Sequence, residues 1–299
     1  MMSKALYYLV IKPLSWLPFS LLYLLSSFLY VVLYKLVGYR KKVVIRNLTA
    51  SFPDKSDAEI NQIVSRFYKH LSDLIVESVK FFSISKRQAL QRLHVINPEL
   101  IDDYADKGQS VIIVGGHYCN WEIIAIALDL NIKHQSVALF TKLNDVFFNK
   151  VMLESRTKFG IKMVTTKDSA RYFEQESRDN TAIIFGADQS PTYNKNVVWT
   201  HFLNQETALA FGTERYAKKY DYPVLYGAIQ RTKRGHYSFE LSLITDKPNE
   251  TAHGFISIEH TRRLEKQILD EPSNWLWTHK RWKRTRKEGE SITTVEKEI

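Results

Sequence analysis

Cysteine is nearly absent from this chain, since Cys119 is the one cysteine among 299 residues. A single cysteine excludes an intramolecular disulfide and any metal site built from several thiolates. Acidic residues are also outnumbered: 42 lysines and arginines stand against 32 aspartates and glutamates, which gives a formal net charge of +10. This balance favours acidic partners, namely nucleic acid, an anionic membrane surface or an acidic protein.

Charge is missing altogether from residues 13–34, near the N-terminus. Such a run is long enough to enter or cross a hydrocarbon core about 30 Å thick. Basic residues flank it, and the larger cluster, Lys35 with residues 40–42, lies downstream, so the positive-inside tendency leaves the main domain cytoplasmic. No small-residue cleavage site follows the run, which argues against a cleaved signal peptide. Pro13 and Pro18 leave an in-plane segment open as an alternative to a span.

Apolar runs typical of strands alternate with helix-like stretches after this segment. Ser56 and Glu59 have capping-box spacing and open an amphipathic helix that continues to Val79. Strands are expected at 110–115, 136–140, 162–166, 181–187, 223–229 and 237–244. Helices are expected near 121–130, 145–159, 169–177 and 206–219. This alternation predicts an α/β fold, a mixed central sheet flanked by helices, with a membrane anchor at 1–42 and a single domain at 43–299.

The stretch "GGHYCNWE", residues 115–122, places ionisable side chains at the end of an apolar strand. Two glycines suit a tight turn, and Asn120 is a suitable cap for the helix that follows. His117 then lies in the turn and Glu122 in the first helical turn, where the chain can fold back and bring them together. A carboxylate bonded to one imidazole nitrogen would leave the other nitrogen as a general base. The alternative is a structural or solvated histidine.

Two other chemistries at this turn are less favoured. Cys119 allows a thiolate that forms an acyl-enzyme, but it is better interpreted as a small packing residue. Metal binding by His117 and Glu122 lacks a third ligand at suitable spacing, so no metal and no cofactor are expected.

The motif His117, four residues, then Glu122 resembles the H-x-x-x-x-D/E motif of glycerolipid-type acyltransferases. Its setting is more specifically similar to the lipid A biosynthesis acyltransferases, the late lauroyl and myristoyl transferases of Gram-negative bacteria. Other blocks resemble that family in the expected order: the apolar N-terminus, "RNLTASFP" at 46–53, "SRTKFG" at 155–160, "GADQSP" at 186–191 and "WLWTHKRWK" at 275–283. The resemblance covers most of the chain and implies a glycerolipid-acyltransferase-like fold.

The resemblance also implies a reaction. In that family an acyl chain moves from an acyl carrier protein thioester to a hydroxyl of a lipid A precursor, at the bacterial inner membrane with the catalytic domain on its cytoplasmic face. Carried onto this sequence, His117 would deprotonate the hydroxyl and Glu122 would orient His117. Arg156 would stabilise the oxyanion or contact a phosphate. An exposed helix arginine is the alternative for Arg156.

Three further residues are candidates for binding the acceptor or orienting a loop. Asp188 and Gln189 follow the strand at 181–187, at the edge where open α/β sheets place ligand sites; an ordinary turn explains them about as well. Asn47 matches the asparagine of the family's N-terminal block. The basic run 279–284 is either a solvated face or, because it contains tryptophan, suited to a membrane interface.

The expected partners are therefore acyl carrier protein, a lipid acceptor and the membrane. Nucleic acid is not expected, because an apolar segment precedes the domain and no nucleic-acid motif is present. The sequence leaves open an acyltransferase for an aminolipid, a lysophospholipid or a phosphatidylinositol mannoside. It also leaves open a membrane-bound relative that has lost the chemistry.

Overall fold

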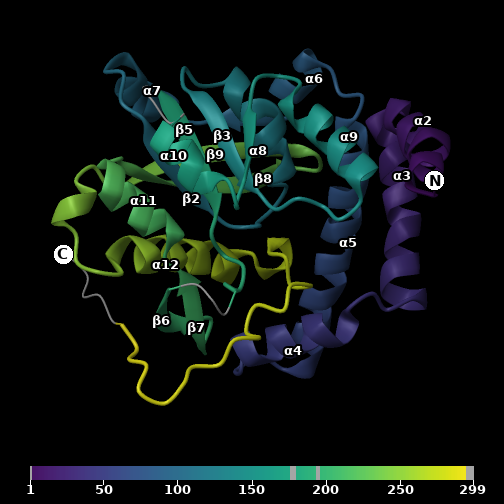
Figure 1. Ribbon diagram of the computed structural model, residues 1–299. Coiled ribbons are helices and arrows are strands. Elements are labelled where there is room, and N and C mark those ends of the chain that lie inside the picture. The colour runs from purple at the N-terminus through teal and green to yellow at the C-terminus, as the bar shows by residue number, and fades with distance from the viewer. Residues whose placement is uncertain (1, 176–179, 193–195, 294–299) are drawn as a thin grey trace.

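The computed structural model describes residues 2–175, 180–192 and 196–293 (Figure 1). Its centre is a curled seven-stranded sheet with the order β1-β9-β8-β2-β5-β3-β4. β8 and β9 are antiparallel, and the other neighbouring pairs of this sheet are parallel. The strands are β1 Leu93–Val95, β2 Val111–Gly115, β3 Gln135–Phe140, β4 Lys162–Thr165, β5 Thr181–Gly186, β8 Val224–Lys233 and β9 His236–Thr245. This architecture confirms the predicted mixed α/β sheet.

Helices flank both faces of the sheet (Figure 1). Along one face lie α10 Ser169–Gln175, α11 Gly212–Tyr220 and α12 Phe255–Asp270. The other face is covered by α5 Asp57–Phe81, α6 Lys86–Leu90, α8 Glu122–Ala127 and α9 Val146–Thr157. Beyond the N-terminal segment, the described residues also form α4 Lys41–Ser51, α7 Glu99–Asp106 and the short 3₁₀ segments η3 Leu128–Leu130, η4 Pro248–Glu250 and η5 Pro272–Asn274.

Alternate residues of the central strand β2 pack on opposite faces of the sheet, as strand geometry requires. Ile112 and Val114 join the apolar cluster of α10 and α11, whereas Ile113 faces α8 and α9. Both faces of the strand are covered, which is why it reads as an unbroken apolar run. The capping box of Ser56 and Glu59 is present at the start of α5, as predicted.

All six predicted strands are present, but the helix predicted at 206–219 is wrong in its first half. Residues 197–210 form an antiparallel hairpin of β6 Val197–Phe202 and β7 Gln205–Ala210, and α11 begins only at Gly212. Leu203 and Asn204 both have positive φ, at 51° and 61°, which is the geometry of a tight two-residue hairpin turn. The last two residues of the helix predicted at 169–177 lie outside the described residues.

The N-terminal apolar segment is helical, as predicted. It contains α1 Met2–Leu6, the π-helical η1 Tyr7–Ile11, α2 Lys12–Trp16, α3 Phe19–Tyr30 and the π-helical η2 Val31–Leu36. Pro18 is extended and breaks the helix between α2 and α3. Residues 19–36 are long and apolar enough to cross a membrane by length and composition. Figure 1 shows α3 alongside α5, at the edge of the molecule.

The tryptophan-rich segment 275–283 packs its tryptophans against the core, while Lys280 and Lys283 are exposed. Trp275 and Trp277 are fully buried, and Arg281 is buried as well, with its guanidinium donating to the carbonyl of Ala208 at 2.8 Å. The segment passes beneath the end of β2, so its aromatic rings fill the core. The basic run 279–284 thus combines a buried Arg281 with exposed lysines, and its assignment to a solvated face or to a membrane interface stays a prediction.

Candidate active site

Two neighbouring parallel strands deliver the polar side chains of the site to one edge of the sheet. β2 ends at Gly115 and β5 at Gly186, and these glycines are partners in the strand register. His117 follows the first glycine by two residues, and Asp188 follows the second in the same way. Because parallel strands end at the same edge, the two side chains emerge next to each other.

Asp188 binds the imidazole of His117. Nδ1 of His117 lies 2.6 Å from Oδ1 of Asp188, and the backbone N–H of His117 donates to Oδ2 at 2.9 Å. The indole N–H of Trp275 donates to the same Oδ2 at 2.8 Å. A carboxylate only accepts hydrogen bonds, so Nδ1 carries a proton, and in the neutral imidazole Nε2 has the lone pair.

Glu122 does not bond to His117, contrary to the sequence prediction. Its carboxylate is held by Arg156 of α9 in a bidentate pair, with Nε 2.9 Å from Oε2 and Nη2 2.7 Å from Oε1. Glu122 is the first residue of α8, from which its side chain reaches across to α9. Asp188, from the neighbouring strand, already occupies Nδ1 of His117. The structure thus gives Asp188 the contact that was expected of Glu122.

Burial and charge act in opposite directions on this pair. Burial alone would lower the pKa of the His117 imidazole, but the charge of Asp188 and its hydrogen bond outweigh burial and raise that pKa above its usual value. For Asp188, burial would raise the pKa, yet the charge and hydrogen bonds of His117 and the indole of Trp275 hold it far below its usual range. Asp188 is therefore a carboxylate at any physiological pH.

The turn that carries His117 is fixed by backbone contacts to the segment near Trp275. The Cys119 N–H donates to the carbonyl of Asn274 at 2.9 Å, and the Leu276 N–H donates to the carbonyl of His117 at 3.2 Å. Cys119 has φ of 47°, a left-handed conformation that an L side chain rarely adopts without such support. Its thiol is fully buried, and burial raises its pKa to about 12. The thiolate alternative is therefore not supported.

Asn120 caps α8, as predicted, and also connects the turn to α5. Its Oδ1 accepts the N–H groups of Glu122 at 3.1 Å and Ile123 at 3.3 Å, the contacts of an N-cap. Its Nδ2 donates to the buried carboxylate of Glu77 at 2.6 Å. The first turn of α8, and with it Glu122, is thus held from both sides.

A cavity of about 400 Å³ opens beside His117, between the sheet and the helices α8 and α9. Its wall is largely apolar, with Trp121, Ile124, Met152, Met163, Ile184 and Phe239 among the lining residues. Polar side chains also line this cavity, and those next to the histidine turn include Glu122, Arg156 and Gln189 as well as His117 itself. An apolar cavity with a few convergent polar groups is the usual form of a small-molecule site.

Gln189 and Gly186 control the space around His117. The amide nitrogen of Gln189 lies 3.2 Å from Nε2 of His117, so in the neutral ring it donates to the lone pair of Nε2. A Cβ on Gly186 would lie 3.1 Å from Cε1 of His117, closer than ordinary packing allows. Because glycine has no Cβ, Gly186 provides the space that the imidazole occupies.

Asn47 lies away from the cavity. It is buried in α4, and its Nδ2 donates to the carbonyls of Trp277 at 3.0 Å and His279 at 2.9 Å. These contacts fix the segment that supplies Trp275 to Asp188. They are those of a residue that orients a loop, one of the two roles expected of it.

Comparison with known proteins places this site in a family. The sequence profile of the bacterial lipid A biosynthesis acyltransferases matches residues 1–284. The chain belongs to this family. It is an acyltransferase, and His117, Glu122, Arg156 and Asp188 lie within the matched residues.

Two relatives support the assignment along nearly the whole chain. The chain is 22% identical to the lipid A biosynthesis lauroyltransferase of Escherichia coli K12 over 292 residues, which is 92% of this chain and 93% of that protein. It is 24% identical to a lipid A biosynthesis acyltransferase of Haemophilus influenzae over 259 residues, 83% of this chain and 79% of that protein.

Among the residues that the structure describes, no group of three or more His, Cys, Asp or Glu side chains is placed to hold a metal ion. The contact that sequence reasoning missed in this acyltransferase is the one from Trp275 to Asp188, which spans 87 residues. A tryptophan in a basic run gives no local signal for a buried hydrogen-bond donor. The matching glycine endings of β2 and β5 were the available signal for the pairing of His117 with Asp188.

Proposed function

We propose that this acyltransferase moves a fatty acyl chain from an acyl carrier protein thioester to a hydroxyl of a lipid A precursor. It would act at the bacterial inner membrane, with residues 1–42 as the anchor and residues 43–299 as one acyltransferase domain on the cytoplasmic face. The observation that carries the proposal is the His117–Asp188 pair beside an apolar cavity. A base of this kind suits a hydroxyl, and an apolar cavity suits an acyl chain.

His117 is the proposed general base. Nε2 takes the proton of the acceptor hydroxyl as its oxygen attacks the thioester carbonyl, and Gln189 must first yield its contact with Nε2. A C–O bond forms and the C–S bond breaks, and the imidazolium returns the proton to the departing sulfur as a thiol. Asp188 keeps the ring in the reactive tautomer and stabilises the imidazolium between the two steps.

Arg156 and Glu122 are proposed to act together at the cavity. Two N–H groups of Arg156 are engaged by Glu122, so a contact with the oxyanion or with a phosphate falls to its other N–H groups. Glu122 fixes the plane of the guanidinium, and a fixed donor is worth more to a transition state than a mobile one. We propose Glu122 as a positioning residue for Arg156 and no longer for His117.

The net charge of the chain supports the proposed acyl donor, and the two relatives support the proposed acceptor. A net charge of +10 suits docking of an acidic carrier protein. Both relatives named above are lipid A biosynthesis enzymes by name. The acceptors left open by the sequence (an aminolipid, a lysophospholipid and a phosphatidylinositol mannoside) keep the same mechanism.

The test is an acyl-transfer assay with detergent-solubilised protein, labelled acyl-acyl carrier protein and a panel of acceptors. The panel contains a tetra-acylated lipid A precursor, an aminolipid, a lysophospholipid and a phosphatidylinositol mannoside. Transfer to the lipid A precursor that is lost in His117→Ala supports the proposal. Transfer only to another acceptor overturns the substrate but keeps the mechanism, and carrier protein binding without transfer to any acceptor favours a non-catalytic relative.

A further inference from the structure

The helix α3, which is apolar enough to span a membrane, is joined to α5 along its length. Three hydrogen bonds between side chains connect the two helices: Tyr30 with Ser65 (2.9 Å), Ser26 with Asp73 (2.6 Å) and Tyr23 with Glu77 (2.9 Å). The order of these contacts shows that the two helices run antiparallel. Just before α3, the ammonium of Lys80 binds the carbonyls of Ser15 at 2.9 Å and Leu17 at 3.0 Å.

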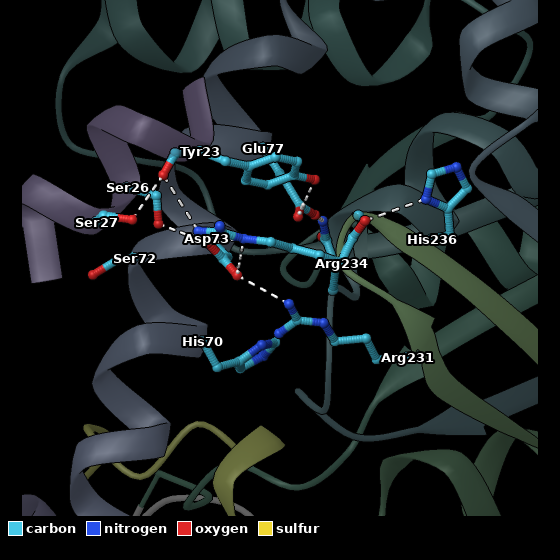
Figure 2. A network of polar contacts seen from close by, with 12 residues as sticks. Tyr23, Ser26, Ser27, His70, Ser72, Asp73, Glu77, Arg231, Arg234 and His236 are labelled. Carbon is cyan, nitrogen blue, oxygen red and sulfur yellow. Dashed lines mark hydrogen bonds and ion pairs between the residues drawn. The ribbon is translucent and has the colours of Figure 1, made fainter. Parts of the chain in front are cut away.

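Charged groups of α5 and of the β8–β9 hairpin lie at the same level as the middle of α3 (Figure 2). We call the part of the molecule after residue 42, to which they belong, the body. Asp73, which receives the Ser26 hydroxyl, also binds the guanidinium groups of Arg231 at 3.1 Å and Arg234 at 3.0 Å. Glu77, which receives the Tyr23 hydroxyl, also binds Tyr237 at 2.8 Å. Asp73 and Glu77 belong to α5, and Arg231 belongs to β8. These three charged groups cannot move away from α3 without breaking the hydrogen bonds described here.

Further charges line α3 toward its two ends. At its C-terminal end, the exposed Arg66 and Lys69 project from α5, and the Lys69 ammonium lies 5.6 Å from the centre of the Tyr30 ring. At its N-terminal end, Arg92 stacks on Phe19. If α3 crossed the bilayer, all these cations would enter the hydrocarbon with it, and charged side chains are strongly disfavoured there.

Both sides of the apolar segment also contact the same body. Before α3, the ring of Tyr7 in η1 lies 5.6 Å from that of Phe147 in α9, and the Lys4 ammonium lies over Phe147. After α3, Tyr34 of η2 packs on α5, where its ring stacks on that of Tyr68. A bilayer between residues 4 and 42 would have to pass through these contacts.

We propose that α3 does not span the membrane but lies in the plane of its surface. One face of the helix stays docked on α5, and the other face enters the border of the hydrocarbon. The outward face is apolar, and its exposed members include Leu21, Leu24, Leu25 and Phe28, with the exposed Val31 directly after the helix. Its occupant is a bilayer with anionic lipids, because cations flank the helix in sequence, Lys4 and Lys12 before it and Lys35 with residues 40–42 after it. The inference rests on the proposed function at a membrane.

The in-plane arrangement is consistent with the placement of the cavity. The loop before α9 carries Leu143, which lines the cavity, and α9 begins with the exposed Val146 next to the Phe147 that η1 contacts. The apolar N-terminal segment and this side of the cavity are therefore neighbours. An in-plane anchor would hold the cavity at the lipid surface from which an acyl acceptor comes.

The test determines on which side of the membrane each end of α3 lies. The full-length protein is produced with an epitope tag ahead of its first residue, and Lys42→Cys and Lys107→Cys are made as exposed reporters after α3 and on the body. The native Cys119 is buried, so the parent protein is the unlabelled control. Sealed spheroplasts and inside-out vesicles receive protease for the tag and a membrane-impermeant maleimide for the cysteines.

The in-plane helix predicts that the tag and both cysteines react in inside-out vesicles and are protected in sealed spheroplasts. Digestion of the tag in intact spheroplasts, while both cysteines stay protected, would show that α3 spans the membrane and would overturn the inference alone. Release of the protein from membranes by salt without detergent would overturn both the inference and the proposed membrane location. These three outcomes separate the two proposals.

Discussion

Asp188 contacts His117 at two points, the imidazole Nδ1 at 2.6 Å and the backbone N–H at 2.9 Å. One carboxylate therefore fixes both the ring and the turn that carries it. Trp275 donates a further hydrogen bond to Asp188 from a segment 87 residues away. The reactivity of His117 thus depends on packing at the C-terminal end of the chain.

Replacing Trp275 with phenylalanine removes one hydrogen bond from Asp188 and leaves the aromatic core nearly intact. Loss of a donor to a buried carboxylate should lower the free energy of unfolding by about 1.5–3 kcal/mol and kcat by roughly tenfold. Thermal unfolding and transfer assays measure the two effects. Trp277→Phe is the matched control, because its indole N–H donates to the carbonyl of Pro272 and not to Asp188. Equal loss of kcat in both variants would show that Trp275 acts through stability alone.

Adding a methyl group at Gly186 should displace the imidazole. In Gly186→Ala the new Cβ would stand 3.1 Å from Cε1 of His117, so the ring must shift by a few tenths of an ångström. Because acyl transfer depends on the position of the base, kcat should fall by about tenfold or more. Gly212→Ala adds the same methyl group where no atom lies within 4 Å. A Gly186→Ala enzyme with normal kcat would contradict the assigned role of His117.

Glu122 and Arg156 should behave as a unit. Each is about one-fifth exposed and each is the other's partner, so removing either leaves a partly buried charge unpaired. In a cycle of Glu122→Gln and Arg156→Gln we expect a coupling free energy of about 1–3 kcal/mol in transition-state stabilisation. Glu122 raises and Arg156 lowers the pKa of His117, behind the larger effects of burial and Asp188, so the double variant should leave the acidic limb of the pH profile in place. If the losses of kcat/KM in the two single variants simply add in the double variant, Glu122 and Arg156 do not act as a unit.

Acid should destabilise the fold through two buried histidines. Burial lowers the pKa of His70 and of His260 to about 4 each, against about 6.5 when unfolded. The folded state then binds fewer protons than the unfolded state between these values, so their contribution to stability is complete above about pH 6.5 and is lost as the pH falls toward 4. His260→Gln should flatten the dependence of Tm on pH in this window. His94→Gln, at an exposed histidine, serves as the control, and an unchanged slope in His260→Gln would contradict the assignment.

Local patterns predicted the elements better than their partners. The strands were visible because β-branched runs such as Val111–Gly115 end at glycines, and α5 because Ser56 and Glu59 cap it. Residues 206–210 contain alanine and leucine, which favour a helix, but pairing with β6 overrides that preference. Periodicity along the chain carries no information on which strands will be neighbours.

The pairing of His117 with Asp188 shows the same limit at the site. Both residues were candidates, yet Glu122 was expected as the partner because it is near in sequence. The sheet places β5 next to β2, and that order brings together residues 71 positions apart. The burial of Trp275 and Trp277 is likewise a property of the assembled core and has no signal in the local sequence.

The most direct test of the account is the pH dependence of kcat/KM in Asp188→Asn beside the wild type. The charge of Asp188 raises the pKa of His117, and only the neutral imidazole accepts the hydroxyl proton, so activity should rise with pH through that pKa. Without the charge, burial lowers this pKa. In Asp188→Asn the acidic limb of kcat/KM should therefore shift to lower pH, and its plateau should fall by roughly 10²- to 10⁴-fold. An unshifted limb in Asp188→Asn, with a shift in Glu122→Gln instead, would contradict the account.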